Sequence, residues 1–223
     1  MHPVCFSPEG DLAGGLVVGA IGVDACRHLR GRNSQLLLAT TPLLLGVHQI
    51  DESLAWWSVD GDLPRAVGRI AMWVYLVIAL VVVPILVPLA ILKLAVTKRR
   101  RRALSSFVLL GAGVAAVLLV TMIHGPVTVR RGSYHLAYSI GLRHGMLIIG
   151  LYVVATCGSL LFSGYKHILI FGMVNVVVVV VLAILTADGF ASLWCFYAAL
   201  TSGAISLHLR FAKAHRERPY ALT

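Results

Sequence analysis

A histidine and a glutamate four residues apart are the first candidates for chemistry in this sequence. His48 and Glu52 share one face of any helix that contains them, and Trp56 follows one turn later. An imidazole beside a carboxylate can bind a metal ion or transfer a proton. Because both groups lie in a long apolar stretch, where an unpaired ionisable side chain is costly, the pair marks a candidate functional site.

Two cysteines and a tryptophan near the ends of the chain are candidates for the same site. Cys5 precedes the first apolar stretch, and Trp194 and Cys195 lie in the last one. Thiolate, imidazole and carboxylate groups together are typical ligands of zinc or copper. The two cysteines could instead form a disulfide in an oxidising compartment. The candidate ligand or metal pocket therefore consists of Cys5, His48, Glu52, Trp56, Trp194 and Cys195.

Structural roles for these residues remain open. His48 and Glu52 can pair with each other or with Arg69 and so hold two helices together. No short-range spacing such as C-x-x-C or H-E-x-x-H supports a metal site. Three further histidines are secondary candidates: His124, His135 and His144. Of these, His135 and His144 are also typical of solvated loop residues.

The composition indicates a membrane protein. Of the 223 residues, 59% are hydrophobic and 13% are charged, whereas soluble domains carry about 25% charged residues. The net charge of +10 comes mainly from short clusters at the ends of apolar stretches, which suits an anionic inner leaflet better than nucleic acid. We therefore expect a multi-pass protein of the plasma membrane, with the lipid bilayer as its surroundings and no nucleic-acid partner.

Seven apolar stretches predict an all-α fold, a single seven-helix transmembrane bundle over residues 1–223. A bilayer core about 30 Å thick needs about 20 apolar residues per helix, because backbone groups must pair within the segment there. The third stretch is long enough to tilt, or to kink at Pro84 and Pro88. The expected helices are Leu12–Ala25, Leu36–Trp57, Val67–Ala95, Leu104–Ile123, Met146–Phe162, Ile168–Thr186 and Phe190–Leu209.

The distribution of cations orients this bundle. Loops rich in Lys and Arg stay on the cytoplasmic side. Alternating connections divide the 19 Lys and Arg residues into 14 on one side and 5 on the other. The amino terminus is therefore expected outside and the carboxyl terminus inside, with His48 and Glu52 in the outer half. The five outer cations are Arg65, Arg69, Arg130, Arg131 and Arg143.

The outer connection between the fourth and fifth helices has a different pattern. Val127–Arg130 alternates apolar and polar residues, a turn follows at Gly132–Ser133, and Tyr134–Tyr138 comes directly after it. Together these segments predict a β-hairpin. We expect this hairpin to lie over the outer mouth of the bundle.

Three segments together carry a family resemblance. The chain resembles an uncharacterised bacterial family of small multi-helix membrane proteins that begin Met-Cys-Phe-Ser, with Gly-x-His-Gln-x-x-Glu in the second helix and Trp-Cys in the last. The resemblance covers nearly the whole chain and implies no activity. This sequence departs from it by His2-Pro3-Val4 ahead of the cysteine and by Asp51 beside the glutamate. The matched segments are Cys5–Pro8, Gly46–Glu52 and Ser192–Cys195.

Three functions of different classes fit these observations. The first is a membrane protein with a metal- or small-molecule-binding pocket in the outer half of the bundle. The second is a non-catalytic subunit that packs against a larger membrane complex, and a homo-oligomer is equally compatible with the apolar faces. The third is an intramembrane enzyme or proton-coupled carrier with His48 and Glu52 as acid and base. The last helix has no central lysine for a retinal Schiff base.

Overall fold

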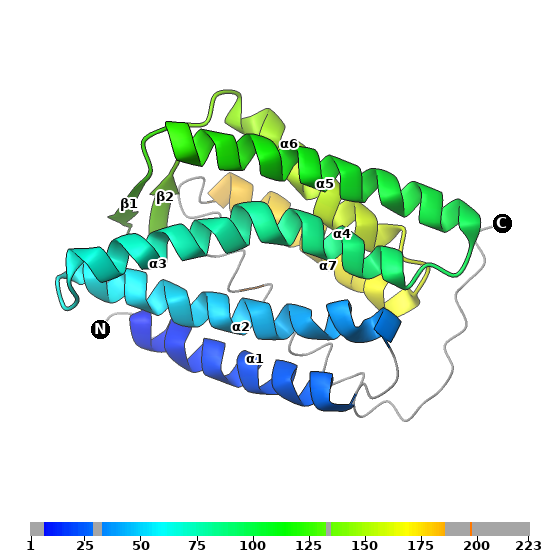
Figure 1. Cartoon of the computed structure of the whole chain (residues 1–223), viewed down its shortest axis with the longest axis horizontal. Coiled ribbons are helices and arrows are strands. Elements are labelled where there is room, and N and C mark those ends of the chain that lie inside the picture. Colours follow the sequence, from blue (N-terminus) through cyan, green and yellow to red (C-terminus); the bar gives the residue numbers. More distant parts are fainter. Residues whose placement is uncertain (1–6, 29–32, 133–134, 186–196, 198–223) are drawn as a thin grey trace.

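Helices make up most of the structure, a computed structural model that describes residues 7–28, 33–132, 135–185 and 197. These residues form six helices, one of them a continuous run of α3, η1 and α4, together with a two-stranded sheet; Figure 1 shows their arrangement. The elements are α1 Pro8–His28, α2 Asn33–Asp60, α3 Arg65–Val77, η1 Ile78–Val82, α4 Val83–Lys93, α5 Lys98–His124, β1 Thr128–Arg131, β2 Leu136–Ser139, α6 Gly145–Leu161 and α7 Lys166–Leu185.

The first six expected helices are all present, and their ends differ from the predicted ones by less than two turns. The apolar pattern marks only the apolar part of each helix, whereas the helix itself begins and ends at its caps. At the start of α5, for example, the Thr97 hydroxyl accepts a hydrogen bond from the Arg100 backbone N–H at 3.3 Å. Of the seventh expected helix, Phe190–Leu209, the structure describes only residue 197, so this helix stays a prediction.

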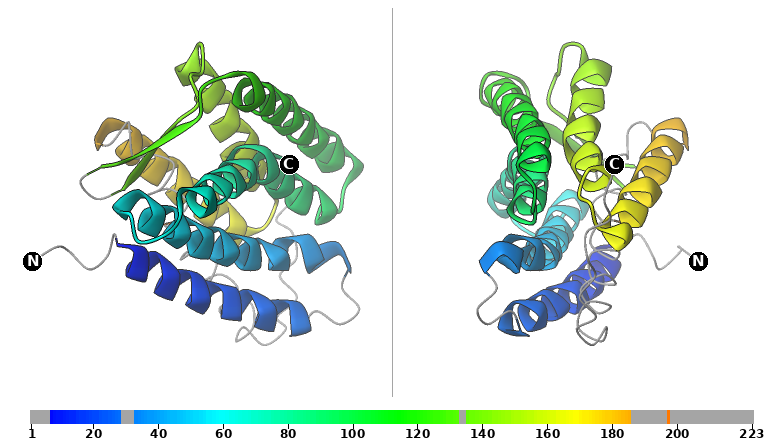
Figure 2. Two further views of the ribbon diagram at one scale, coloured as in Figure 1. Left: turned by 60° about the vertical axis from the view of Figure 1, so that its left-hand side comes forward. Right: turned by 90° about the vertical axis from the view of Figure 1, so that its right-hand side faces the viewer.

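The helices lie roughly side by side, and their described connections alternate between two ends of the molecule (Figure 1). The α2–α3 turn and the hairpin lie at one end, and the α4–α5 and α6–α7 turns lie at the other. Both views in Figure 2 show α1 packed along α2. A Cβ on Gly46 of α2 would lie 2.5 Å from the backbone nitrogen of Gly19 in α1, so these helices approach to backbone contact.

The expected irregularity near Pro84 takes the form of a π turn. Within η1, the Val83 N–H donates to the Ile78 carbonyl, five residues back. The next residue, Pro84, has no N–H with which to serve the Ala79 carbonyl. That carbonyl instead accepts a hydrogen bond from the Tyr152 hydroxyl of α6 at 2.7 Å. The proline therefore widens the helix and ties it to α6.

Two helical runs in the described residues are long and apolar enough to cross a membrane. They are Arg65–Lys93, with 29 residues, and Lys98–His124, with 27. Two further apolar helices, α6 and α7, are shorter in their described parts. Many large apolar side chains point outward, including Met146 and Leu109, which are 82% and 73% exposed.

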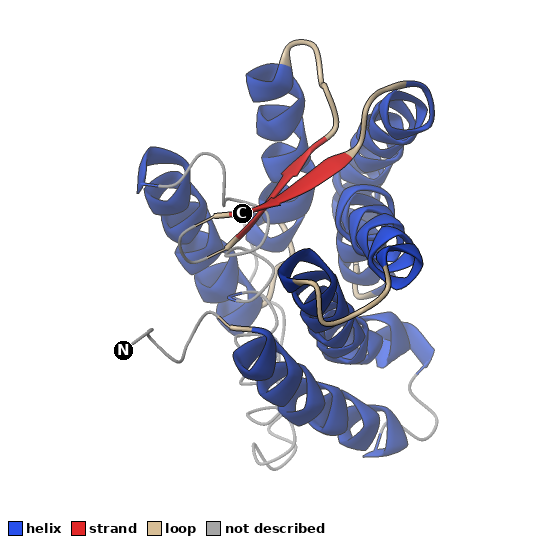
Figure 3. Ribbon diagram, turned by 90° about the vertical axis from the view of Figure 1, so that its left-hand side faces the viewer, coloured by secondary structure: helices blue, strands red, loops and turns tan. Residues whose placement is uncertain are grey.

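The predicted hairpin is confirmed. Strands β1 and β2 are antiparallel, with Val129 opposite Tyr138, and the Gly132 N–H donates to the His135 carbonyl at 2.8 Å. Leu136 of β2 is wholly buried and packs with Trp56 of α2. Seen end-on in Figure 3, the hairpin crosses one end of the helices, so it covers the end where α2 meets α3.

Candidate functional site

Helix α2 buries a polar stripe. His48, Gln49, Glu52 and Ser53 are each fully inaccessible to solvent. Positions i, i+1, i+4 and i+5 of a helix lie on one face, so one side of α2 turns four polar groups toward the interior. Such a polar stripe inside an apolar bundle is expensive unless its groups are paired or bind something.

The His48 ring begins a stack of three rings from three different elements. It lies on the Tyr75 ring of α3 with a centroid separation of 4.1 Å and an interplanar angle of 23°. Tyr75 in turn stacks on Tyr138 of β2 at 4.2 Å and 11°. The stack therefore joins α2, α3 and the hairpin, and it fixes the orientation of the imidazole.

Several polar atoms of the stripe have no partner in the described part of the chain. Neither ring nitrogen of His48 has a hydrogen bond, and neither does Gln49 Oε1. The Gln49 amide does donate to Glu52 Oε2, but at a long 3.4 Å. A buried polar group without a partner costs about 1–3 kcal/mol, so these atoms are candidates for contact with a ligand.

A hydrogen bond between His48 and Glu52, one of the structural alternatives left open by the sequence, is not formed. Instead, Glu52 Oε2 accepts the long hydrogen bond from the Gln49 amide, which lies about one turn away on the same helix. Arg69, the alternative partner for either residue, is exposed on α3. His48 nevertheless holds α2 to α3, through the ring contact with Tyr75.

Trp56 is buried, as its place on the same face of α2 implies, but the sequence did not predict its hydrogen-bond acceptor. The indole N–H donates to Asp11 Oδ2 of α1 at 3.0 Å, and Asp11 is only 5% exposed. An acid in the first turn of a helix normally faces water beside the helix dipole, so the sequence offered no sign of this contact. Its neighbour Glu9 does behave that way, because hydrogen bonds from its own backbone N–H and from Ser7 lower the pKa of its exposed carboxyl.

The hairpin is also tied to α2 by a cation. Arg131 of β1 forms an ion pair with Asp60 at the end of α2. Its guanidinium carbon also lies 5.6 Å from the centroid of the Trp56 ring. Since the Arg131 side chain is 55% exposed, we assign this contact a small stabilising effect and a larger role in placing the hairpin.

A hollow opens beside the stack. It has a volume of about 200 Å³ and lies between α2, α3 and β1, with Arg65, Arg69 and Met72 in its wall. Met72 packs in the same apolar cluster as Tyr75. The wall of this hollow is therefore continuous with the apolar cluster that contains the Tyr75 ring.

The secondary candidates lie in three different settings. His124 is exposed and its Nδ1 contacts the Val120 carbonyl at 2.9 Å. His135 is half-buried and its ring packs on Gly132 of the hairpin turn. His144 is exposed, with a left-handed backbone at φ 56°. Neither these nor the other described His, Cys, Asp and Glu side chains form a group of three that could hold a metal ion.

The remaining candidates fall outside the described residues. They are Cys5, Trp194 and Cys195, together with the disulfide expected between the two cysteines. Two further cysteines are described, Cys26 and Cys157, and both are free thiols.

Comparison with known proteins gives one match. The model of a family of unknown function, DUF6629, matches residues 4–221, which is nearly the whole chain. No curated protein and no solved structure matches.

Proposed function

The chain belongs to the family of unknown function DUF6629, and we propose that it is a multi-pass membrane protein that binds a small ligand between its helices. The binding centre is formed by His48, Gln49 and Glu52 of α2. One observation carries the proposal: the His48 imidazole is fully buried, and neither of its nitrogens has a hydrogen bond to any residue that the structure describes.

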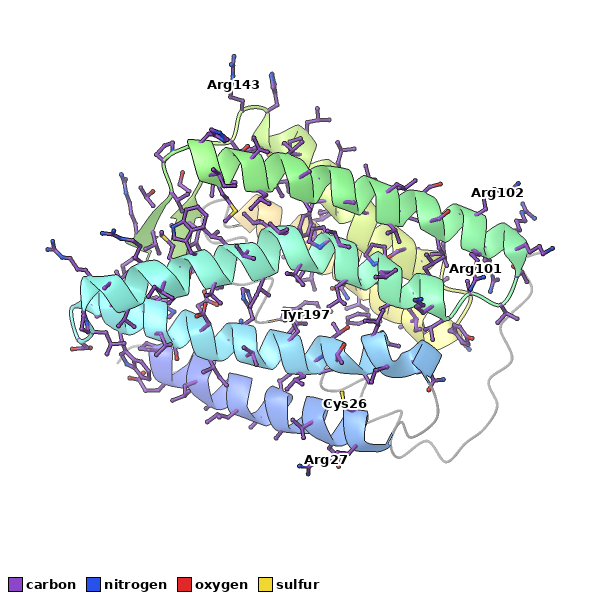
Figure 4. The ribbon with its side chains drawn as sticks, in the orientation of Figure 1. Cys26, Arg27, Arg101, Arg102, Arg143 and Tyr197 are labelled. Carbon is purple, nitrogen blue, oxygen red and sulfur yellow. The ribbon has the colours of Figure 1, made fainter. Side chains whose placement is uncertain are left out.

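The membrane setting is supported by length, apolarity and charge. Two helical runs have the length and composition to cross a bilayer, and outward side chains such as Leu109 and Met146 are suited to contact with lipid. The cations Lys98–Arg102 at the start of α5 gather at one end, and Figure 4 shows Arg101 and Arg102 there, with Arg143 toward the other end. The positive-inside rule then sets the amino terminus outside, in the plasma membrane, with the binding centre in the outer half.

The available atoms define the kind of ligand. A neutral imidazole offers one hydrogen-bond donor and one acceptor, and the Gln49 carbonyl oxygen offers a second acceptor. A ligand that both donates and accepts hydrogen bonds, such as a small molecule with a hydroxyl or amide group, satisfies all three. The stack on Tyr75 holds the imidazole in place for such contacts.

A transition metal is the other ligand that an unpartnered imidazole could take. Zinc and copper need three or four ligands, and α2 supplies only His48 and Glu52. The remaining ligands would come from Cys5 and Cys195, which the sequence predicts at the same depth. If those two cysteines form a disulfide, they cannot serve as thiolate ligands, and mass spectrometry without reductant distinguishes the two cases.

The binding experiment compares two His→Phe variants. The protein is purified from membranes in mild detergent, denatured, and the released small molecules and metals are identified by mass spectrometry. His48→Phe keeps a ring on Tyr75 but removes both nitrogens, whereas His124→Phe is the matched control on an exposed site. We expect a compound or a near-stoichiometric metal in the wild type and the control and its loss from His48→Phe. Equal content in all three proteins would overturn the proposal.

A further inference from the structure

A second hollow lies at the opposite end of the molecule from the hairpin. It is an open hollow of about 410 Å³ along one face of α5, and it is lined by Lys98, Arg99, Arg102, Ala103 and Ser106. We propose that this hollow binds the phosphate headgroup of an anionic phospholipid. Three cations and a hydroxyl, with no carboxylate among the lining residues, favour an anion.

The basic run of α5 does not act as one uniform patch. Arg100 is half-buried and its guanidinium lies against Gly164, where φ is +84° and any Cβ would clash with it. That arginine is therefore used within the protein, to pack α5 on the α6–α7 turn. Lys98, Arg99 and Arg102 are on another face of the helix and line the hollow.

The same face of α5 continues as an apolar stripe. Leu109, Val117 and Val120 are 73%, 46% and 55% exposed, and at 100° per residue they align with Arg102 and Ser106. From Ser106 to Val117 the helix rises about 16 Å, which is about half of a bilayer core. A phospholipid can therefore place its phosphate in the hollow and its acyl chains along α5.

The net positive charge of the hollow favours an anionic headgroup over a zwitterionic one, in which a cation balances the phosphate charge. Arginine binds a phosphate through two parallel N–H···O contacts, and lysine adds a point charge. The Ser106 hydroxyl makes only a long 3.4 Å contact with the Arg102 carbonyl, so it can turn to donate to a phosphate oxygen. A free phosphate would use the same cations but would gain nothing from the apolar stripe, and this difference is testable.

The test uses the full chain in nanodiscs and measures bound lipid by native mass spectrometry. The lipid probes are phosphatidylglycerol and phosphatidylcholine, and inorganic phosphate is the competing anion. The hollow variant is Lys98→Gln, Arg99→Gln, Arg102→Gln. Its matched control, Arg65→Gln, Arg69→Gln, Arg143→Gln, removes the same charge from the opposite end. A further variant, Arg99→Lys with Arg102→Lys, keeps the charges that orient the helices.

The expected result is retention of phosphatidylglycerol over phosphatidylcholine by the wild type and the control. The hollow variant should bind phosphatidylglycerol about 100-fold more weakly, because it lacks the three protein cations that contact the lipid headgroup. The lysine variant should bind it more weakly than wild type, because it loses the paired contacts. Equal binding by the hollow variant and the control, or full affinity in the lysine variant, would overturn the proposal. Displacement of the lipid by inorganic phosphate would assign the hollow to free phosphate and overturn it as well.

Discussion

The imidazole of His48 and the phenol ring of Tyr75 lie face to face with their centroids 4.1 Å apart, inside the end of the bundle that the hairpin covers. Tyr75 is fully buried and carries Tyr138 on its other face. The Tyr75 side chain of α3 thus supports both His48, the candidate ligand-binding residue of α2, and the hairpin. Removal of the Tyr75 ring should therefore affect His48 and Tyr138 as well as the packing at position 75.

Replacing Tyr75 by alanine should therefore loosen the binding centre. Loss of a buried aromatic side chain costs about 3–5 kcal/mol, and here it also frees the His48 ring and Tyr138. Tyr75→Phe keeps the ring and should cost much less. Thermal unfolding in detergent measures both variants. If Tyr75→Ala unfolds at the same temperature as Tyr75→Phe, the stack does not support the site.

The Asp11 contact with Trp56 should be replaceable by an amide but not by a methyl group. Asp11→Asn keeps an oxygen that accepts from the indole N–H, so it should remain close to wild type. Asp11→Ala leaves that buried N–H without its acceptor and should destabilise the fold by about 1–3 kcal/mol. Chemical unfolding of both variants checks the difference. Equal stability would show that α1 is held to α2 by other contacts alone.

Two glycines at the contact between α1 and α2, Gly46 and Gly19, differ in the space around them. A Cβ on Gly46 would lie 2.5 Å from the Gly19 nitrogen, whereas a Cβ on Gly19 has no atom within 4 Å. Gly46→Ala should thus push the helices apart and destabilise the protein by about 1–3 kcal/mol, and Gly19→Ala should be tolerated. The yield of folded monodisperse protein reports the effect. Similar yields for the two variants would contradict this packing.

Helix positions were predictable because apolar stretches and helix length are both visible in the chain. The hairpin was predictable for a similar reason, from the alternation of Val127–Arg130 and the turn at Gly132–Ser133. The contacts of the site were not. Spacing places His48 and Glu52 on one face of α2, but it does not show that Gln49 takes up the carboxylate. The stack on Tyr75 depends on how α3 is rotated about its axis, and periodicity in an almost wholly apolar helix does not define that rotation.

The hydrogen bond from Tyr152 to the Ala79 carbonyl provides a test of the π turn. Because Pro84 supplies no N–H at this point, the tyrosine hydroxyl is the donor that serves the carbonyl. Tyr152→Phe keeps the ring and removes the donor, so it should destabilise the protein by about 1–3 kcal/mol. In the Pro84→Ala background the new N–H can serve the carbonyl, and the cost of Tyr152→Phe should shrink. A double-mutant cycle on unfolding free energies measures this coupling, and additive effects would mean that the proline and the tyrosine act independently.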